Sequence, residues 1–449
     1  MSAPRRTLSL LFAATAIAAI IPLAASLGQP AAQTDKVPGG VTPLHAPMPP
    51  LSAEEIIKHS ARGGGGGQAA DYNVSRRSDF DKALPNPYVV NQVWYTMPKG
   101  RYIGGASAIQ IDRDGRSLWV AERCGTAGAC GDSHVDPIIH FSADGKILKM
   151  FGHDLIAYPH GMYIDKQDNV WVSDTESNND ASCKTCTVPG TGRGGGSDNN
   201  KAHPGGGQVL KFSPQGKLLL RIGVPGVYGN DESHFSQPSD VVTDDAGNIY
   251  VADGHDSAPA NNRIVKFDKT GKFIKAWSAC QPWQERQIDC GHSITIDNDG
   301  RLIVANRGNN LLDIFDTDGK LLAEWANWGK SSGLYVDKND ILYSADSQSG
   351  AGNGNSFEKG VHIGSARTGE VTAFIPDPLG NATAWQPGGT LSPEGVTADK
   401  DGRIYTSSVR PPGLMRWTIA TNTPPVRLGG AGGGGRGGRG RGGAPAGGE

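Results

Sequence analysis

One sequence pattern occurs six times between residues 106 and 417. Each copy opens with a short apolar segment, a turn that contains Asp, Asn or Gly, and a second apolar segment, as in "PHGMYIDKQDNVWVSD". A further pair of short segments around a Gly turn follows, as in "FSADGKILKMF". Two turn signals in each copy indicate four strands, and no helical periodicity separates the copies. The chain is therefore predicted to be all-β, a six-bladed β-propeller with four-stranded blades.

The copies are aligned by an aspartate that follows the first strand of each. These aspartates are Asp112, Asp165, Asp244, Asp297, Asp337 and Asp399. The sixth copy ends early, near Trp417, and so lacks an outer strand. We expect the segment "YVVNQVWYTM" at residues 88–97 to supply that strand, because this would close the ring and remove an exposed sheet edge.

The sequence outside the repeats divides the chain into four predicted regions. Arg5 and Arg6 precede an apolar run that ends in small residues, which is typical of a secretory signal peptide over residues 1–27. We predict a Pro- and Gly-rich linker for residues 28–84, the propeller for 85–427 and a disordered Gly/Arg-rich tail for 428–449. We therefore expect an exported protein, periplasmic or secreted, and an uncleaved membrane anchor is the second interpretation of the apolar run.

The charge and the cysteines restrict the partners and the compartment. The formal net charge of −2 predicts neither a nucleic acid nor an anionic membrane surface as a partner. The six cysteines form three short-range pairs, Cys124/Cys130, Cys183/Cys186 and Cys280/Cys290. In an exported protein these pairs indicate local disulfides, although a Cys-x-x-Cys spacing such as the second also occurs in redox motifs and metal sites.

Histidines and an acid share one register at one end of the predicted ring. The first strand of each blade lines the channel, and the second runs antiparallel to it, so the first begins and the second ends at the same end, which we call the mouth. The residues five positions before the aligned aspartates are Ser107, His160, Ser239, His292, Ser332 and Glu394. His160, His292 and Glu394 belong to alternate blades, about 120° apart, and would converge on the axis. Two imidazoles and a carboxylate suit catalytic zinc or non-haem Fe(II), and the alternative is a set of hydrated channel residues.

Three further side chains are predicted to face the mouth. Arg123 and Arg307 each follow the end of a second strand, and because guanidinium groups bind carboxylates in a bidentate manner, they indicate an anionic substrate. His255 lies just beyond the second strand of the third copy and is a candidate for proton transfer near neutral pH. The alternatives are that the arginines pair with blade aspartates and that His255 is a solvated loop residue.

Other polar residues are predicted to be structural. Asp174, Asp253 and Asp346 recur at the ends of second strands, where we expect them to accept hydrogen bonds from loop backbone. His140 and His362 share no register with the mouth residues and are expected to be surface or packing residues.

The histidine-bearing segments resemble NHL-repeat propellers and, among these, the peptidyl-α-hydroxyglycine α-amidating lyases. The matching stretches are "PHGMYIDKQDNVWVSD", "QPSDVVTDDAGNIYVADGH", "NRIVKF" and "GHSITIDNDGRLIVANRGN" within residues 85–420. The resemblance implies a six-bladed propeller that holds zinc through three channel histidines and also binds structural calcium. It further implies cleavage of a C-terminal α-hydroxyglycine into a peptide amide and glyoxylate.

The resemblance also implies roles for individual residues. Four residues match the family, namely His160 and His292 as metal ligands and Arg123 and Arg307 as site arginines. The chain departs from the family at three positions. Glu394 stands where the family has its third metal histidine, His255 replaces the tyrosine of a "DGY" motif, and Gly395 replaces the acid after the third histidine. The metal ligands are thus similar, whereas the group that handles protons is changed.

These observations predict an exported, metal-dependent, lyase-like enzyme that acts on a small-molecule or peptide substrate with a carboxylate. Zn2+ is the expected ion, with Fe2+ as the alternative, and we expect a monomer. In this interpretation Arg123 and Arg307 hold the carboxylate and His255 acts as the base. Two alternatives remain, because a fold alone does not determine a function. One is a non-catalytic propeller that binds a peptide, glycan or protein, and the other is a calcium-dependent hydrolase of the lactonase type.

Overall fold

The computed structural model describes residues 80–91, 94–126, 129–130, 133–175, 206–255, 261–350, 357–377, 392–410 and 412–420. The predicted signal peptide, most of the predicted linker, the predicted tail, and Cys183 and Cys186 lie outside these residues. Within the described ranges, the structure contains no helix with the length and apolar character needed to cross a membrane.

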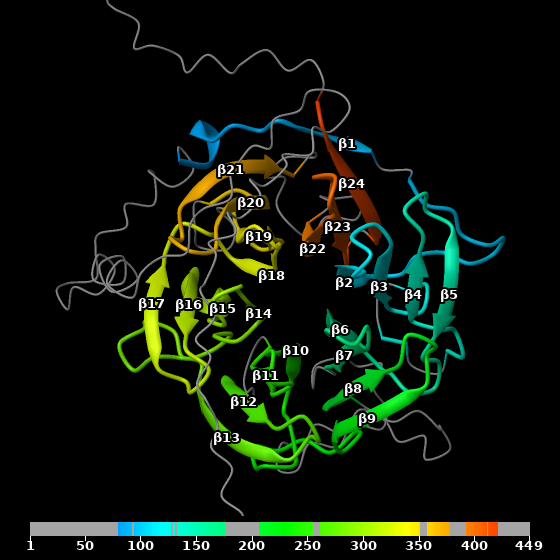
Figure 1. The fold of residues 1–449 in the computed structure, drawn as a ribbon. Coiled ribbons are helices and arrows are strands. Elements are labelled where there is room, and N and C mark those ends of the chain that lie inside the picture. The colour runs from blue at the N-terminus through cyan, green and yellow to red at the C-terminus, as the bar shows by residue number, and fades with distance from the viewer. Residues whose placement is uncertain are drawn as a thin grey trace, which may run out of the picture. The chain divides into compact units, whose positions relative to one another are not determined.

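The described residues form six four-stranded antiparallel sheets arranged as a ring (Figure 1). Blade 1 consists of β2 (Ala106–Ile111), β3 (Leu118–Glu122), β4 (Ile138–Phe141) and β5 (Ile147–Phe151). Blade 2 consists of β6 (Pro159–Ile164), β7 (Val170–Asp174), β8 (Gln208–Phe212) and β9 (Leu218–Gly223). Blade 3 consists of β10 (Pro238–Thr243), β11 (Ile249–Asp253), β12 (Arg263–Phe267) and β13 (Phe273–Ser278).

The remaining three blades have the same strand order. Blade 4 consists of β14 (Ile294–Ile296), β15 (Leu302–Asn306), β16 (Leu311–Phe315) and β17 (Leu321–Trp325), with a short 3-10 helix, η1 (Arg307–Asn309), after β15. Blade 5 consists of β18 (Ser331–Val336), β19 (Ile341–Asp346), β20 (Gly360–Ser365) and β21 (Val371–Pro376). Blade 6 consists of β22 (Pro393–Ala398), β23 (Ile404–Ser408) and β24 (Gly413–Ile419) with β1 (Tyr88–Asn91) as its outer strand.

The ring is closed by the start of the described chain. Val89 and Val90 of β1 lie opposite Thr418 and Trp417 of β24 in an antiparallel pair. Next to this pair, Trp94 is buried between Phe141 of blade 1 and Tyr405 of blade 6. The prediction that this segment supplies the missing outer strand is confirmed, and the strand is shorter than the predicted 88–97.

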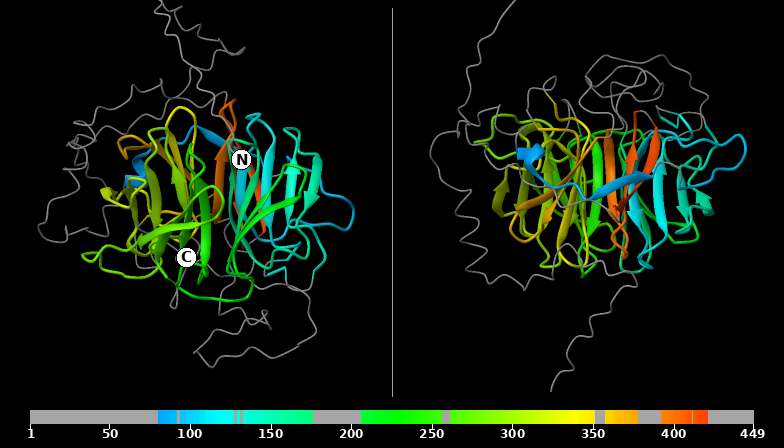
Figure 2. Two further views of the ribbon diagram at one scale, coloured as in Figure 1. Left: turned by 60° about the horizontal axis from the view of Figure 1, so that its bottom comes forward. Right: turned by 90° about the horizontal axis from the view of Figure 1, so that it is seen from above.

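The first strand of each blade lies at the centre of the ring, around the channel (Figure 1). Further views show the strands of the blades running along the direction of this channel (Figure 2). In β7, Val172 packs toward blade 1 and its neighbour Trp171 toward blade 3, because successive side chains of a strand point to opposite faces. This packing fixes the angular position of each blade and therefore the direction in which its inner strand presents side chains to the axis.

The aligned aspartates hold the turns at the end of the channel opposite the mouth. In blade 2, Asp165 Oδ1 accepts hydrogen bonds from the backbone N–H groups of Gln167 and Asn169, and Asp165 Oδ2 accepts one from Trp171 Nε1. In five blades the aspartate N–H also donates to the carbonyl of the residue that precedes the second strand, and in blade 5 it donates to the carbonyl of Ile341, the first residue of β19. The repeat thus keeps its aspartate because the turn needs an acceptor there.

The end of the predicted linker contacts the propeller. Residues 80–83 form a helical turn. Asp81 is 1% exposed, accepts a hydrogen bond from the Glu358 backbone N–H, and lies 3.0 Å from Nε2 of the buried His362. His140 stacks on Trp119 with 3.9 Å between ring centres. Both histidines therefore have the packing roles predicted for them.

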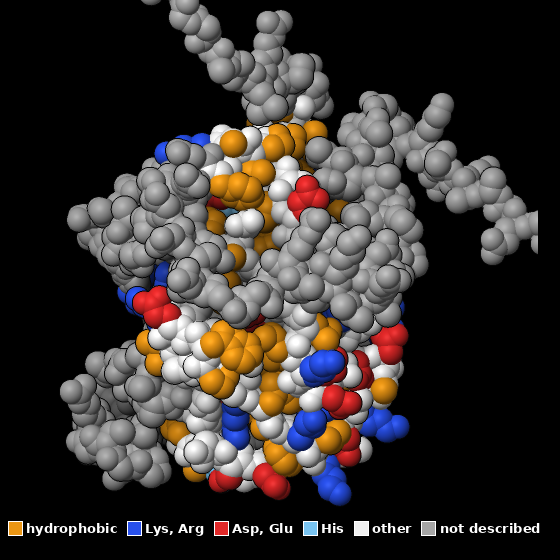
Figure 3. All heavy atoms as spheres, turned by 90° about the vertical axis from the view of Figure 1, so that its left-hand side faces the viewer, with side chains coloured by type: hydrophobic (Ala, Val, Ile, Leu, Met, Phe, Trp, Pro, Cys, Tyr) orange, Lys and Arg blue, Asp and Glu red, His pale blue; other side chains and the backbone are white. Residues whose placement is uncertain are grey.

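One face of the propeller carries side chains of both charges. On the face that Figure 3 shows, acidic and basic side chains are interspersed among apolar ones. This distribution agrees with the small net charge of the sequence.

Candidate metal centre

Three histidines meet at the mouth of the channel. His160 lies on β6, His292 lies just before β14, and His255 follows β11. Their ring centres are 4.5 Å apart for His160 and His255, and 4.9 Å apart for each of the other two pairs. One nitrogen from each ring can be chosen so that all three lie within 4.8 Å of one another. This spacing makes the three imidazoles candidate ligands of one ion, because zinc binds imidazole nitrogens at about 2.0–2.1 Å.

The hydrogen bonds of two rings leave a lone pair directed at the cluster. His160 Nδ1 donates to the Ser239 carbonyl at 2.8 Å, and His292 Nδ1 donates to the Ser332 carbonyl at 2.9 Å. Because the proton of a neutral imidazole then sits on Nδ1, Nε2 of each ring carries the lone pair. Both Nε2 atoms, and Nδ1 of His255, are buried and make no hydrogen bond to a described residue. This is the arrangement that metal-binding histidines adopt, with a backbone carbonyl fixing each ring.

All three imidazoles are held in the neutral form. Burial is the largest cause that lowers the pKa of His160, His255 and His292 well below the ordinary value. The positive charge of Arg307 lowers the pKa of His255 and His292 further, and His255 and Arg123 do the same for His160. Neutral imidazole is the form that binds a metal ion, so the three histidine nitrogens suit the expected zinc ion.

His255 reaches the cluster because of the loop that carries it. The N–H groups of Gly254 and His255 both donate to the Gln237 carbonyl, at 3.1 and 3.3 Å. A Cβ on Gly254 would lie 2.9 Å from Cα of Asn262, so the chain passes close to the start of blade 3's third strand at this point. These contacts turn the chain after β11 back over the mouth, and His255 is half-buried beside His160 and His292.

Glu394 lies next to two of the three histidines. Its Oε1 is 3.6 Å from His292 Nε2 and 3.9 Å from His160 Nε2. The same oxygen is 4.0 Å from Arg307 Nη1, and the side chain is 12% exposed. Glu394 is thus the carboxylate that links the histidines to the arginine, and it accepts no hydrogen bond from a described residue.

The two predicted arginines also lie at the mouth and are buried. Arg307 is 1% exposed, and its Nε donates to Asp289 Oδ2 at 2.7 Å. Arg123 is 4% exposed, and its guanidinium carbon is 3.8 Å from the centre of the Tyr158 ring. Arg307 therefore pairs with an aspartate, as one alternative proposed, but this aspartate belongs to the loop between blades 3 and 4 and not to a blade.

The structure brings together the side chains that share one register at the mouth. The six residues of the shared register, Ser107, His160, Ser239, His292, Ser332 and Glu394, line one cavity. The chemical roles given to these residues remain predictions.

Sequence reasoning missed two lysines near this cluster. Lys330 and Lys359 are 8% and 4% exposed, and burial lowers the pKa of both. The positive charge of Arg307 lowers the pKa of Lys330 further, whereas the negative charges of Asp346, Asp377 and Glu394 raise that of Lys359.

The aspartates that end the second strands are structural, as predicted. Asp174 accepts hydrogen bonds from the N–H groups of Ala157 and Tyr158, and Asp253 accepts from those of Ser236 and Gln237. Asp346 accepts from the N–H group of Lys330 at 2.8 Å. These bonds hold the loop that leads into each inner strand.

Blade 4 uses a different arrangement, with Asn306 at this position and the acid on β16. Asp313 is fully buried, and its Oδ2 accepts hydrogen bonds from Gln284 Nε2 and Asn306 Nδ2 at 2.9 and 2.7 Å. Burial raises the pKa of Asp313 to about 7, although these two hydrogen bonds oppose the shift.

Replacing Asp313 with Asn should make the protein's stability less dependent on pH. The native carboxyl keeps its proton up to about pH 7, whereas the unfolded chain loses it near pH 4, so the free energy of unfolding of the wild type falls between these values. The difference between Asp313→Asn and wild type should therefore grow as pH rises from about 4 to about 7, at up to about 1.4 kcal/mol per pH unit. Urea unfolding of both proteins across this range measures it, and a difference that does not vary with pH would contradict the burial of an acid here.

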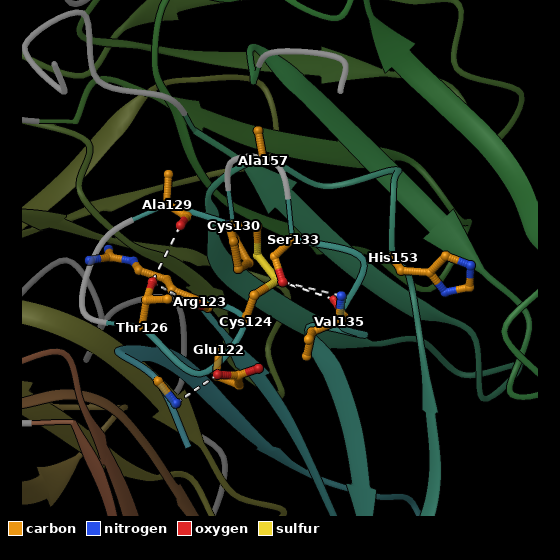
Figure 4. Close-up of a disulfide and its surroundings, with 12 residues drawn as sticks. Glu122, Arg123, Cys124, Thr126, Ala129, Cys130, Ser133, Val135, His153 and Ala157 are labelled. Carbon is orange, nitrogen blue, oxygen red and sulfur yellow. Dashed lines mark hydrogen bonds between the residues drawn. A yellow bond between two sulfur atoms is a disulfide. The ribbon is translucent and has the colours of Figure 1, made fainter. Parts of the chain in front are cut away.

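Two of the predicted cysteine pairs form disulfides, and each is close to a mouth arginine. Cys124 and Cys130 are joined, and Arg123 directly precedes this bridge (Figure 4). Cys280 and Cys290 are joined, and Asp289, the partner of Arg307, directly precedes Cys290. These two predictions are confirmed, and both bridges stiffen loops that adjoin the candidate site.

Comparisons with known proteins identify relatives with the same repeats. The sequence profile of the family described as "Strictosidine synthase-like, N-terminal" matches residues 377–410. NHL repeat-containing protein 3 of Mus musculus is 28% identical over 50% of this chain and 56% of that protein. Peptidyl-glycine alpha-amidating monooxygenase of Mus musculus is 31% identical over 39% of this chain and 15% of that protein.

A third relative carries only the name of the lyase. It is the probable peptidyl-alpha-hydroxyglycine alpha-amidating lyase of Caenorhabditis elegans, 28% identical over 39% of this chain and 41% of that protein. The chain thus spans at most 56% of the length of these three relatives. It is a six-bladed β-propeller whose homologues include NHL-repeat proteins and peptidyl-α-hydroxyglycine α-amidating lyases.

Proposed function

We propose that this protein is an exported, metal-dependent lyase that cleaves α-hydroxyglycine-type carboxylate substrates. The observation that carries the proposal is the meeting of three neutral imidazoles, one carboxylate and two buried arginines at one end of the channel. The names of the lyase relatives support the reaction class, and the two disulfides support export.

The metal ion would be held by His160, His255 and His292. This assignment exchanges two roles expected from the sequence, in which Glu394 was the third ligand and His255 the base. The spacing of the three rings supports His255 as a ligand, because three nitrogens lie within 4.8 Å of one another. A zinc ion bound there would polarise the hydroxyl or carbonyl oxygen of the substrate.

The other residues would bind the substrate and move its proton. The guanidinium groups of Arg307 and Arg123 would hold the substrate carboxylate, with its hydroxyl toward the histidines. Cleavage of the N–C bond then requires that the hydroxyl loses a proton and that the leaving nitrogen gains one. Glu394 Oε1 is placed to accept the hydroxyl proton, since it lies between the histidines and Arg307 and accepts no hydrogen bond from a described residue.

The calcium-dependent hydrolase is less well supported than the lyase. Calcium prefers six to eight oxygen ligands. Among the described residues that line the cavity, the acidic side chains are Glu394 and Asp240. Asp240 Oδ2 already accepts hydrogen bonds from Ser293 Oγ and the Ile294 N–H, at 2.6 and 3.1 Å, and burial raises its pKa to about 7. The mouth is therefore a nitrogen-rich site, which suits zinc or iron better than calcium.

Metal content and glyoxylate release test the proposal together. The full chain, purified and reloaded with zinc, is expected to bind about one ion per chain and to release glyoxylate from an N-acylated α-hydroxyglycine. A chain that binds zinc without releasing glyoxylate would contradict the reaction. A chain that binds no transition metal would favour the non-catalytic binding protein, and activity that depends on calcium alone would favour the hydrolase.

A further inference from the structure

Arg307 is held in place by the loop that connects blade 3 to blade 4. Its Nε donates to Asp289 Oδ2 at 2.7 Å, and the N–H of the next residue, Gly308, donates to the Asp289 carbonyl at 2.9 Å. Asp289 is 8% exposed and Arg307 is 1% exposed, so the pair is largely shielded from water. One loop residue therefore fixes both the guanidinium group and the backbone that carries it.

The loop is itself tightly constrained where it meets Arg307. Asp289 has a φ of +57°, in the left-handed region that residues other than glycine seldom adopt. Cys290, the next residue, is bridged to Cys280, and its N–H donates to Asn262 Oδ1 of blade 3 at 3.1 Å. A Cβ on Gly308 would lie 2.1 Å from the Ile288 carbonyl oxygen, so the loop backbone sits directly against the residue after Arg307.

We infer that Asp289 is a positioning residue for Arg307, and that the Cys280–Cys290 disulfide holds Asp289 where it can act. The inference rests on the proposed role of Arg307 in holding the substrate carboxylate. Arg307 Nη1 is already 4.0 Å from Glu394 Oε1. Without Asp289, the guanidinium group would be free to turn toward Glu394. An ion pair between Arg307 and Glu394 would then occupy both the group proposed to bind the substrate carboxylate, which we call the carboxylate clamp, and the group proposed to accept the proton. Asp289 holds the guanidinium group beside the mouth at 4.0 Å from Glu394 Oε1, which is beyond hydrogen-bond distance.

The same blade offers a matched control at its other end. Arg301 precedes β15 and Arg307 follows it. Arg301 Nε donates to Asp297 Oδ2 at 2.7 Å, and both residues are buried. Asp297→Asn and Asp289→Asn thus remove the same charge from the same kind of buried pair, at the two ends of one strand, and only the second pair adjoins the candidate site.

The test compares these two variants in the full, zinc-loaded chain with an N-acylated α-hydroxyglycine as substrate. Asp289→Asn is expected to raise KM about tenfold, the usual size of a lost contact to a charged group, with zinc content unchanged. Asp297→Asn should leave KM within about twofold of wild type. The double variant Cys280→Ala, Cys290→Ala should raise KM in the same direction as Asp289→Asn and retain zinc. An unchanged KM in this double variant, with a raised KM in Asp289→Asn, would overturn the role of the disulfide.

A crystal structure of Asp289→Asn keeps the inference testable even if the proposed function is wrong. If Arg307→Ala does not change KM, Arg307 does not bind the substrate carboxylate. The position of Arg307 in the Asp289→Asn crystal structure then decides whether Asp289 positions it. A guanidinium group that has turned to Glu394 supports the positioning role. One that stays in its wild-type position overturns it, as does an unchanged KM in Asp289→Asn when Arg307→Ala raises KM.

Discussion

Replacing His292 with Ala should remove the bound transition metal and lower kcat/KM by about a thousandfold or more. His292 is fully buried, its Nδ1 is fixed by the Ser332 carbonyl, and its Nε2 is directed at His160 and Glu394. Elemental analysis of the purified variant, together with steady-state kinetics, measures both effects.

His140→Ala is the control for the loss of a histidine. His140 stacks on Trp119 within blade 1, and its Nε2 is 3.1 Å from Ser117 Oγ, so its removal affects packing and not the mouth. This variant should keep the zinc content and the kcat/KM of the wild type. If His292→Ala retains one zinc per chain with unchanged affinity, His292 is not a ligand and the metal centre is assigned wrongly.

Replacing Arg307 with Ala should raise KM about a hundredfold while zinc content stays unchanged. The variant loses the guanidinium group beside the substrate carboxylate and also leaves Asp289 buried without that partner. Removal of one member of a buried charge pair between two binding partners costs about 2–5 kcal/mol, and a hundredfold change, about 2.7 kcal/mol, lies within this range. Steady-state kinetics with an N-acylated α-hydroxyglycine measures KM, and elemental analysis measures the zinc.

Arg301→Ala separates a binding role from a structural one. Arg301 makes the equivalent buried pair with Asp297 at the opposite end of β15. Its loss should destabilise the blade without changing KM. If Arg301→Ala and Arg307→Ala changed KM equally, KM would depend on any ion pair of blade 4. The proposed binding of the substrate carboxylate by Arg307 would then have no support.

The register of the repeats was enough to predict the ring and most of its mouth. Each blade has the same turn, held by an aspartate such as Asp165, so counting back five residues leads to the same height on the channel wall. This count predicted that His160, His292 and Glu394 lie near one another, although their segments are far apart in the sequence. The outer strand of blade 6 was also predictable, because a closed ring leaves no unpaired edge.

Residues outside the repeats were harder to place, because loops between strands follow no common register. His255 was predicted to reach the mouth, but its closeness to His160 depends on how the loop after β11 bonds to the Gln237 carbonyl. Asp289 belongs to an interblade loop, and its position next to Cys290 was the one available signal. Lys330 was missed because burial and side-chain direction, not sequence spacing, place it near Arg307.

The central claim is that blades 2, 3 and 4 direct three histidine nitrogens at one ion. Anomalous diffraction from crystals of the zinc-loaded protein, recorded at the zinc absorption edge, tests it most directly. We predict one strong peak at about 2.0–2.1 Å from Nε2 of both His160 and His292, with a nitrogen of His255 as a further ligand. A zinc peak elsewhere on the molecule, with His160 and His292 bound to no ion, would contradict the account.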